Sequence, residues 1–276
     1  MRHRPIMDAN VPATREVRVL RYVDAQHEWA RDQVICERPV ALVFNGVSHA
    51  VMMATPTDLE DFALGFALSE GLIAHFDDCR DLEIADNTEG LEVRLQISTR
   101  AFSEMQARRR GLNGRTGCGL CGVDSLQALR DSHPPPLPTE ARQAPIEPER
   151  ILQAFSRLHE HQALQADTGG CHAAAWANAQ GELLAVREDV GRHNALDKLI
   201  GHLARARLLK QRGMVLVSSR ASYELVSKCA RMGLDTLAAV SAPTSMAIEL
   251  AQETGVRLYG FCRGDRAVAY TAPTHA

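Results

Sequence analysis

The fold is decided by residues 214–261, MVLVSSRASYELVSKCARMGLDTLAAVSAPTSMAIELAQETGVRLYGF. Short apolar runs in this stretch have the length of buried strands, and they alternate with segments whose apolar residues recur at helical spacing. The predicted strands cover residues 214–218, 236–240 and 256–261, and the predicted helices cover residues 222–232 and 243–253. Strands that alternate with helices predict a mainly parallel sheet with helices on both faces.

The same pattern continues on both sides of this stretch. Pro148 is suited to the first position of a helix, which we expect to run to about Leu164. We therefore predict an α/β domain over residues 149–276. Its further elements are a hairpin over residues 173–178 and 182–186, a helix over 192–209 and a last strand over 267–270.

A second, smaller unit is predicted before this domain. Asn45 and Gly46 form the dipeptide that type I′ hairpin turns favour, and apolar runs flank them. Thr57 and Glu60 have the spacing of a capping box, which predicts that a helix begins there. We expect this α+β part to cover residues 31–130. Its strands are predicted over 39–44, 47–53 and 91–97, and a polar helix follows that carries Arg108, Arg109 and Arg110.

Two segments with little regular patterning frame these units. Residues 1–30 predict an N-terminal arm in which only 16–23 has the pattern of a strand. Residues 131–148 contain six prolines, and they form either a linker between the units or a stiff loop across one surface. We expect Trp29 and Trp176 in the core.

The composition is that of a globular protein without a preference for polyanions. Of the 276 residues, 45% are hydrophobic and 24% are charged, and 31 Lys and Arg nearly balance 34 Asp and Glu. A general binder of nucleic acid or of membrane surfaces needs a basic excess. No apolar run approaches the roughly 20 residues that span a bilayer, and the N-terminal residues lack the apolar segment of a secretory signal. We expect a cytoplasmic protein that binds neither nucleic acid nor membrane.

Cys118 and Cys121 are the one closely spaced pair among seven cysteines. An odd count favours reduced thiols over a disulfide framework. The pair lies in residues 111–122, where five glycines in twelve residues predict a loop, because each glycine destabilises a helix.

Three chemical roles fit a cysteine pair of this spacing. A structural zinc site needs four ligands, to which Cys171 and His172 could contribute. A thioredoxin-type exchange site normally starts a helix directly after a strand, which this loop does not. The third role is sulfur carriage, in which a thiolate takes the outer sulfur of a donor persulfide and a second thiol relays it. A loop suits carriage because the sulfur must visit both a donor protein and an acceptor.

Polar turns follow four of the predicted strands, and ligands of such sheets bind outside the carboxyl ends of the strands. Their hydroxyls, glycines and arginines suit a phosphorylated ligand of nucleotide size, because three of the turns lead into helix N-termini. The residues concerned are Arg192, His193, Ser218, Ser219, Arg220, Arg263 and Arg266. The hydroxyl residues could instead serve only as helix N-caps. No Walker A motif occurs, and no GxGxxG lies between a predicted strand and a predicted helix, as the dinucleotide-binding fingerprint requires.

Seven longer motifs carry a resemblance to a known family. They are PVALVFNG at 39–46, DFALGF at 61–66, GRTGCGLCG at 114–122, TGGCHAAAW at 168–176, EDVGRHNALDK at 188–198, VSSRASY at 217–223 and GFCRGDR at 260–266. Together they resemble the FdhD family of formate dehydrogenase accessory sulfurtransferases. The resemblance covers about residues 30–272.

The resemblance implies a cytidine-deaminase-like fold, with a mixed sheet, helices on both faces and a smaller N-terminal α+β part. It implies sulfur transfer from a cysteine desulfurase to the molybdenum bis(molybdopterin guanine dinucleotide) cofactor, which activates formate dehydrogenase. The persulfide role falls on Cys118, with Cys121 assisting, and a homodimer is expected. The family's cofactor-binding stretch falls on Phe261, Cys262, Arg263, Gly264, Asp265 and Arg266.

Two other functions stay open at this point. A non-catalytic chaperone would hold the cofactor with the polar turns and would not use the thiols. A zinc hydrolase related to the deaminases would need His-x-Glu, whereas His172 is followed by two alanines. We therefore expect no structural metal.

Overall fold

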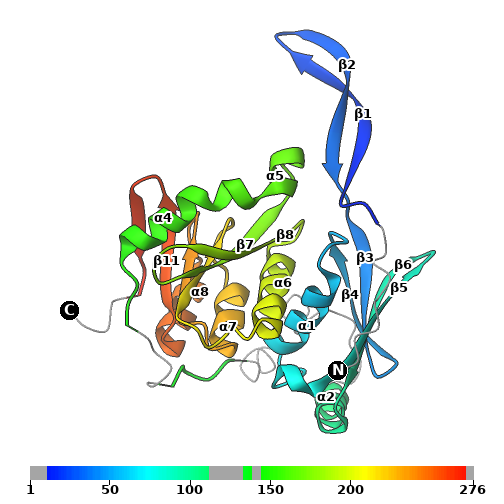
Figure 1. The fold of residues 1–276 in the computed structure, drawn as a ribbon, viewed down its shortest axis with the longest axis vertical. Coiled ribbons are helices and arrows are strands. Elements are labelled where there is room, and N and C mark those ends of the chain that lie inside the picture. The colour runs from blue at the N-terminus through cyan, green and yellow to red at the C-terminus, as the bar shows by residue number, and fades with distance from the viewer. Residues whose placement is uncertain (1–10, 112–132, 139–143, 272–276) are drawn as a thin grey trace.

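The computed structural model describes residues 11–111, 133–138 and 144–271 (Figure 1). Its largest sheet has six strands in the order β12-β11-β10-β9-β7-β8. The three central strands, β9 (Gly213–Val217), β10 (Thr236–Ala239) and β11 (Arg257–Arg263), are parallel. The others, β7 (His172–Asn178), β8 (Leu183–Asp189) and β12 (Arg266–Ala269), pair antiparallel with their neighbours. The predicted mixed α/β architecture is confirmed, but only its centre is parallel, because short turns join β7 to β8 and β11 to β12.

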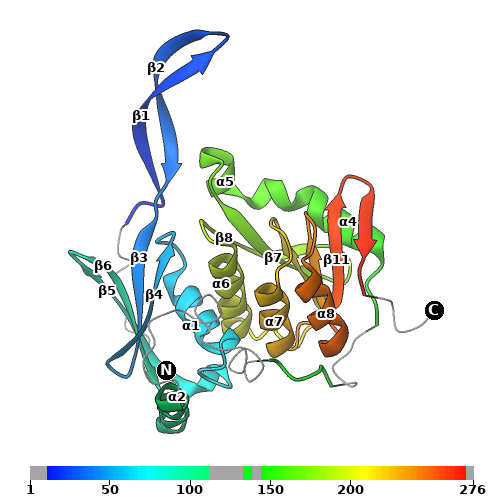
Figure 2. The same ribbon diagram turned by 180° about the vertical axis from the view of Figure 1, so that it is seen from behind.

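Helices cover both faces of this sheet (Figures 1 and 2). One face carries α6 (Arg192–Arg205), α7 (Tyr223–Arg231) and α8 (Ser245–Thr254), and the other carries α4 (Pro148–Leu158). Along β9, Val215 packs on the α6 side while Leu216 packs with Ile151 of α4. This alternation is the two-residue period of a strand that is buried on both faces.

The N-terminal unit is a four-stranded sheet in the order β4-β3-β6-β5, with α1 against it. Asn45 and Gly46 both have positive φ, 48° and 81°, as the predicted hairpin turn requires. The elements are β3 (Arg38–Phe44), β4 (Val47–Ala54), α1 (Leu59–Ser69), η1 (Phe76–Asp78), β5 (Cys79–Asn87), β6 (Gly90–Ile97) and α2 (Thr99–Gly111).

The two sheets share one hydrophobic core, because α1 packs directly on α6. Glycines make this crossing close. A Cβ on Gly65 would lie 1.7 Å from the Asp197 carbonyl oxygen, and a Cβ on Gly201 would lie 1.9 Å from the Asp61 carbonyl oxygen. The backbones therefore approach to a distance that no larger residue permits.

The N-terminal arm is a long hairpin of β1 (Thr14–Val23) and β2 (Gln26–Ile35) that extends away from both sheets (Figure 2). The boundary predicted at residue 30 falls inside β2. The prediction that Trp29 is a core residue is wrong, since Trp29 is 62% exposed and the Arg18 guanidinium lies 4.1 Å from its ring centroid. Trp176 is buried as predicted.

The predicted capping box is also wrong. Asp58 is the N-cap of α1, in a left-handed conformation and without a side-chain cap. The Thr57 hydroxyl accepts a hydrogen bond from Lys198 Nζ at 3.1 Å, and Glu60 pairs with Arg205. Long-range partners therefore replace the reciprocal local bonds that the spacing suggests.

Two predicted helices are shorter than expected. Pro148 begins α4 as predicted, but α4 ends at Leu158, and η4 (His159–His161) and α5 (Ala163–Thr168) follow. The break comes at Gln162, whose φ of −105° and ψ of 68° are not helical. The helix α6 ends at Arg205, because Arg207 turns the chain away with a φ of 59°.

The described parts of the proline-rich segment lie against the α/β domain. Leu137 is buried and its N–H donates to the Thr254 carbonyl oxygen at 2.8 Å, while Ile146 is buried in the core beneath α4. Both contacts agree with a stiff loop across one surface. Within the described residues, no helix is both long and apolar enough to cross a bilayer.

Candidate functional site

Four strands of the large sheet end at the same edge. The strands β9, β10 and β11 are parallel, and β8 points the same way because both β8 and β9 are antiparallel to β7. Neighbouring strands lie about 4.8 Å apart, so the turns after β8 and β11 are about 19 Å apart. That span suits a ligand of dinucleotide size, and the polar turns form this edge as predicted.

The turn after β8 leads into α6 and presents Arg192 and His193. The Nε of Arg192 is buried and has no hydrogen-bond partner among the described residues. His193 Nε2 lies 3.4 Å from the Ser222 hydroxyl and 3.8 Å from a carboxylate oxygen of Glu224, both at the start of α7. At this end of the edge, a guanidinium whose Nε has no hydrogen-bond partner among the described residues therefore lies beside a half-buried imidazole.

Burial favours the neutral form of the two histidines at this edge, His193 and His172. Desolvation, and next the charge of Arg192, lower the pKa of His193 to about 4. The same two causes lower the pKa of His172, which begins β7 at this edge. At neutral pH, Arg192 therefore supplies the positive charge and the imidazoles supply neutral donors or acceptors.

The low pKa of His193 predicts a pH-dependent stability. The unfolded chain binds this proton near pH 6.5 and the folded protein binds it only near pH 4. The contribution of neutral His193 to the free energy of unfolding is therefore fully present above pH 6.5. It is lost as the pH falls to 4, and the loss is at most about 3 kcal/mol. Urea unfolding of His193→Gln at several pH values should show a flatter profile in this window. Exposed His27→Gln is the control, and an unchanged slope in His193→Gln contradicts the assignment.

The turn after β9 is mostly occupied by its own hydrogen bonds. The Ser218 hydroxyl accepts from the Ala173 N–H at 2.8 Å, and the buried Ser219 hydroxyl donates to the Arg220 carbonyl oxygen at 2.9 Å. The Arg220 side chain is exposed and makes no ion pair within the described part of the chain. Of these three predicted site residues, Arg220 alone has its side chain free for a ligand.

A stacked pair lies beside the turn after β11, with Phe261 inside β11 and Arg266 at the start of β12. Phe261 has a φ of 52°, and the Arg266 guanidinium lies 4.9 Å from its ring centroid. Gly264 and Asp265 form the exposed two-residue turn between the paired Arg263 and Arg266. This turn presents two arginines to solvent.

Cys262 is placed differently from its predicted role. Its side chain is fully buried in the core beneath α4, and desolvation raises its pKa to about 12. Cys262 as a whole is inaccessible to a ligand at this edge.

The turn after β10 connects the two ends of the edge. The Thr244 N–H donates to the Ala221 carbonyl oxygen at 3.0 Å, and the Phe261 N–H donates to the Ser241 carbonyl oxygen at 3.1 Å. The structure therefore joins the predicted site residues into one row, with Arg192 and His193 at one end and Phe261 and Arg266 at the other.

The pair Cys118 and Cys121 lies outside the described residues. Of the five cysteines that the structure describes, four are buried, and desolvation is the first cause that raises their pKa values to about 11 or 12. They are Cys79, Cys171, Cys229 and Cys262. These four thiols are poorly suited to nucleophilic chemistry.

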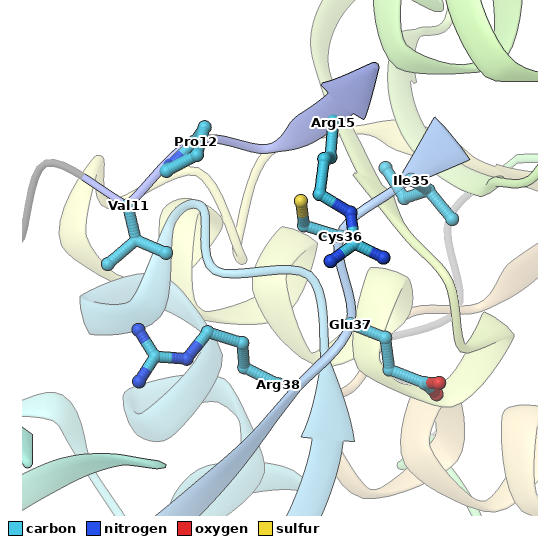
Figure 3. A pocket seen from close by; sticks show the side chains of 7 residues that line it. All are labelled: Val11, Pro12, Arg15, Ile35, Cys36, Glu37 and Arg38. Atoms are coloured by element: carbon cyan, nitrogen blue, oxygen red, sulfur yellow. The ribbon is translucent and has the colours of Figure 1, made fainter. Parts of the chain in front are cut away.

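The fifth described cysteine, Cys36, lines a cavity of about 240 Å³ at the base of the hairpin, with Arg15 and Arg38 (Figure 3). No local pattern in the sequence predicts this cavity, because it forms between residues 11–15 and 35–38. Within the described residues, no three His, Cys, Asp or Glu side chains gather as metal ligands.

Comparisons with known proteins agree with this architecture. A model of the FdhD/NarQ family matches residues 35–276. The sulfur carrier protein FdhD of Bordetella petrii is 51% identical over 243 residues, which cover 88% of this chain and 86% of that protein. The sulfur carrier protein FdhD of Acinetobacter baylyi is 46% identical over 264 residues, which cover 96% and 95%.

The fold also has a relative among solved structures. A crystal structure of a candidate formate dehydrogenase accessory protein from Desulfotalea psychrophila superposes with a TM-score of 0.74 at 23% identity, covering 95% of this chain and 98% of that one. At this identity the likeness supports the fold alone. From the match over residues 35–276 and the close relatives, we conclude that the chain belongs to the FdhD/NarQ family.

Proposed function

We propose that this protein is a sulfurtransferase that carries a persulfide sulfur from a cysteine desulfurase to the molybdenum bis(molybdopterin guanine dinucleotide) cofactor. Formate dehydrogenase is the enzyme that receives the matured cofactor. The relatives named sulfur carrier protein FdhD support the carrier role. The accessory protein of similar fold is consistent with it.

The observation that carries the proposal is the row of cationic turns at the sheet edge. The side chains of Arg192, Arg220, Arg263 and Arg266 lie on turns at the ends of three different strands. A guanine dinucleotide brings phosphates, which arginine binds through paired N–H donors, and a planar base, which stacks on aromatic and guanidinium groups. The Phe261–Arg266 pair is suited to the base and Arg192 to a phosphate.

The sulfur chemistry is proposed for Cys118 and Cys121. The Cys118 thiolate attacks the outer sulfur of the donor persulfide; the donor S–S bond breaks and the donor cysteine leaves as a thiolate. The Cys121 thiolate then attacks the inner sulfur of Cys118, which releases the outer sulfur as hydrosulfide and leaves a disulfide between the two. A thiol reductant restores the pair.

Other parts of the proposal follow from the family resemblance. We propose that the six-stranded domain is cytidine-deaminase-like, that the protein forms a homodimer, and that it acts in the cytoplasm. Mixed strand directions and helices on both faces support the first of these.

The nucleotide part is tested by Arg266→Ala. Removing this guanidinium takes away the stacked cation over Phe261, so we expect the Kd for GDP to rise about tenfold in calorimetric titration. Arg31→Ala, which removes another exposed arginine, from the hairpin, is the matched control and should leave the Kd unchanged. Equal GDP affinity in Arg266→Ala and wild type would remove the Phe261–Arg266 turn from the binding site.

A further inference from the structure

Asp189 is the last residue of β8, and its fully buried carboxylate organises the turn that presents Arg192 and His193. One of its oxygens accepts from the Gly191 N–H at 2.8 Å and from the Asn194 side-chain amide at 2.9 Å. The other accepts from the Thr55 N–H at 3.0 Å and from Lys198 at 2.8 Å. Four donors from three segments of the chain therefore converge on one carboxylate.

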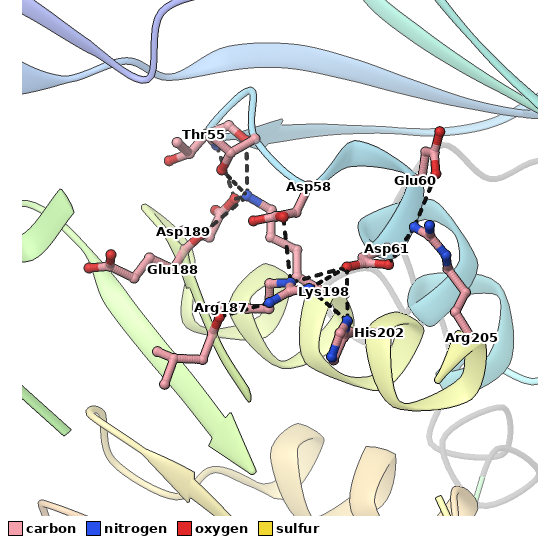
Figure 4. Close-up of polar contacts among 12 residues, drawn as sticks. Thr55, Asp58, Glu60, Asp61, Arg187, Glu188, Asp189, Lys198, His202 and Arg205 are labelled. Atoms are coloured by element: carbon pink, nitrogen blue, oxygen red, sulfur yellow. Dashed lines mark hydrogen bonds and ion pairs between the residues drawn. The ribbon is translucent and has the colours of Figure 1, made fainter. Parts of the chain in front are cut away.

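Lys198 of α6 is equally buried and completes this arrangement (Figure 4). Besides the Asp189 carboxylate, its ammonium donates to the Thr55 carbonyl oxygen at 3.0 Å, the Thr57 hydroxyl at 3.1 Å and the Glu188 carbonyl oxygen at 3.2 Å. An unpaired charge at this depth would strongly destabilise the protein, so loss of either partner alone would be costly.

The contacts also join the turn to the N-terminal unit. Thr55 lies between β4 and α1, and its hydroxyl accepts from the Val190 N–H at 3.1 Å. The Asn194 amide that bonds Asp189 also donates to the Met53 carbonyl oxygen of β4 at 2.8 Å. The backbone of residues 189–194 is thus held from both sides, directly before and within the first turn of α6.

We propose that Asp189 and Lys198 are positioning residues, whose ion pair fixes the turn at residues 190–193 so that Arg192 and His193 meet the phosphorylated ligand. The pair itself contacts no ligand and acts through the turn. This inference rests on the proposed function, because it assigns Arg192 to a phosphate. It adds that the β4–α1 connection of the N-terminal unit is part of the same site.

A second buried ion pair, between α6 and α7, provides a matched control. Lys228 of α7 donates to both carboxylate oxygens of Asp197 at 2.9 and 3.0 Å, and also to Ser69 and Glu70 of the α1 end. This pair is also buried, and within the described residues none of the Lys228 hydrogen bonds reaches residues 189–193. Loss of the Asp197–Lys228 pair should therefore cost stability without displacing the turn.

The test compares two double variants of the full chain. The 189/198 variant combines Asp189→Ala with Lys198→Met, and the 197/228 variant combines Asp197→Ala with Lys228→Met. Each removes both charges of its pair, so the first leaves no buried ion without a partner. The second also takes Lys228 from Glu70, 2.7 Å away, which makes it the more stringent control for general destabilisation. GDP affinity is measured by calorimetry, and hydrogen–deuterium exchange of residues 190–193 is measured without ligand. We expect the 189/198 variant to weaken GDP binding about tenfold and to exchange these amides faster. The 197/228 variant should change the Kd by less than about twofold.

The outcomes separate the inference from the proposed function. If wild type fails to bind GDP, the proposed nucleotide site is wrong, while the exchange of residues 190–193 still decides whether the pair orders the turn. If wild type binds and the 189/198 variant binds equally well, the inference is overturned. It is also overturned if both double variants lose the same affinity, because general destabilisation then explains the loss.

Discussion

Cys118→Ala is expected to abolish the activation of formate dehydrogenase. Without the thiolate no persulfide forms, and the four buried cysteines cannot take its place because burial holds their thiols protonated. In a strain that lacks the natural protein, formate dehydrogenase made beside Cys118→Ala should show no formate oxidation above background. GDP binding by the variant should remain, because the sheet edge is intact.

Cys36→Ala is the matched control for this variant, since Cys36 is the one described cysteine that is not buried. It should support full activation. Activation by Cys118→Ala comparable to wild type would contradict sulfur carriage and would favour the non-catalytic cofactor chaperone.

Gly201→Ala should be among the most destabilising single substitutions in the chain. Its Cβ would lie 1.9 Å from the Asp61 carbonyl oxygen, and the atoms it meets are backbone, which cannot rotate away. The helices α1 and α6 would have to separate and open the core that both sheets share. We expect a loss of at least about 3 kcal/mol in the free energy of unfolding and a Tm roughly 6 °C lower or more.

Gly65→Ala should behave in the same way, because its Cβ would lie 1.7 Å from the Asp197 carbonyl oxygen. Gly233→Ala is the control. Gly233 has a positive φ of 73°, which the helical Gly65 and Gly201 do not have, but its Cβ meets nothing within 4 Å, so the substitution should cost only about 1 kcal/mol. Thermal and urea unfolding of the three variants measure the difference. Equal stability of Gly201→Ala and Gly233→Ala would mean that the helices do not cross so closely.

The sequence predicted those elements whose residues satisfy one another locally. The alternation from β9 to β11 follows from short apolar runs and helical spacing, and Asn45 and Gly46 fixed a hairpin through their tolerance of positive φ. It did not predict the close α1–α6 crossing. Gly65 and Gly201 weaken a helix considered alone, and their value appears only when a second helix lies against them.

The site was predictable to a similar extent. Residues that follow parallel strands share an edge in any such sheet, so Arg192, Arg220 and Arg266 could be grouped from the sequence. The burial of Cys262 could not be predicted, because a register shift between Gly260 and Arg263, with Phe261 at positive φ, turns the Cys262 side chain into the core.

The ion pair between Asp189 and Lys198 was also missed. Both residues stand in the motif EDVGRHNALDK, and their nine-residue separation gives no local signal. Only the fold brings the end of β8 against the side chain of α6 and the loop at Thr55.

The most direct test is to locate the sulfur itself. The protein is incubated with a cysteine desulfurase and cysteine, and peptides are mapped by mass spectrometry without reduction. We predict an added mass of about 32 Da on the peptide that contains Cys118, absent when the desulfurase is omitted. If the added sulfur is found only at Cys36 or at no cysteine, sulfur carriage by Cys118 is wrong.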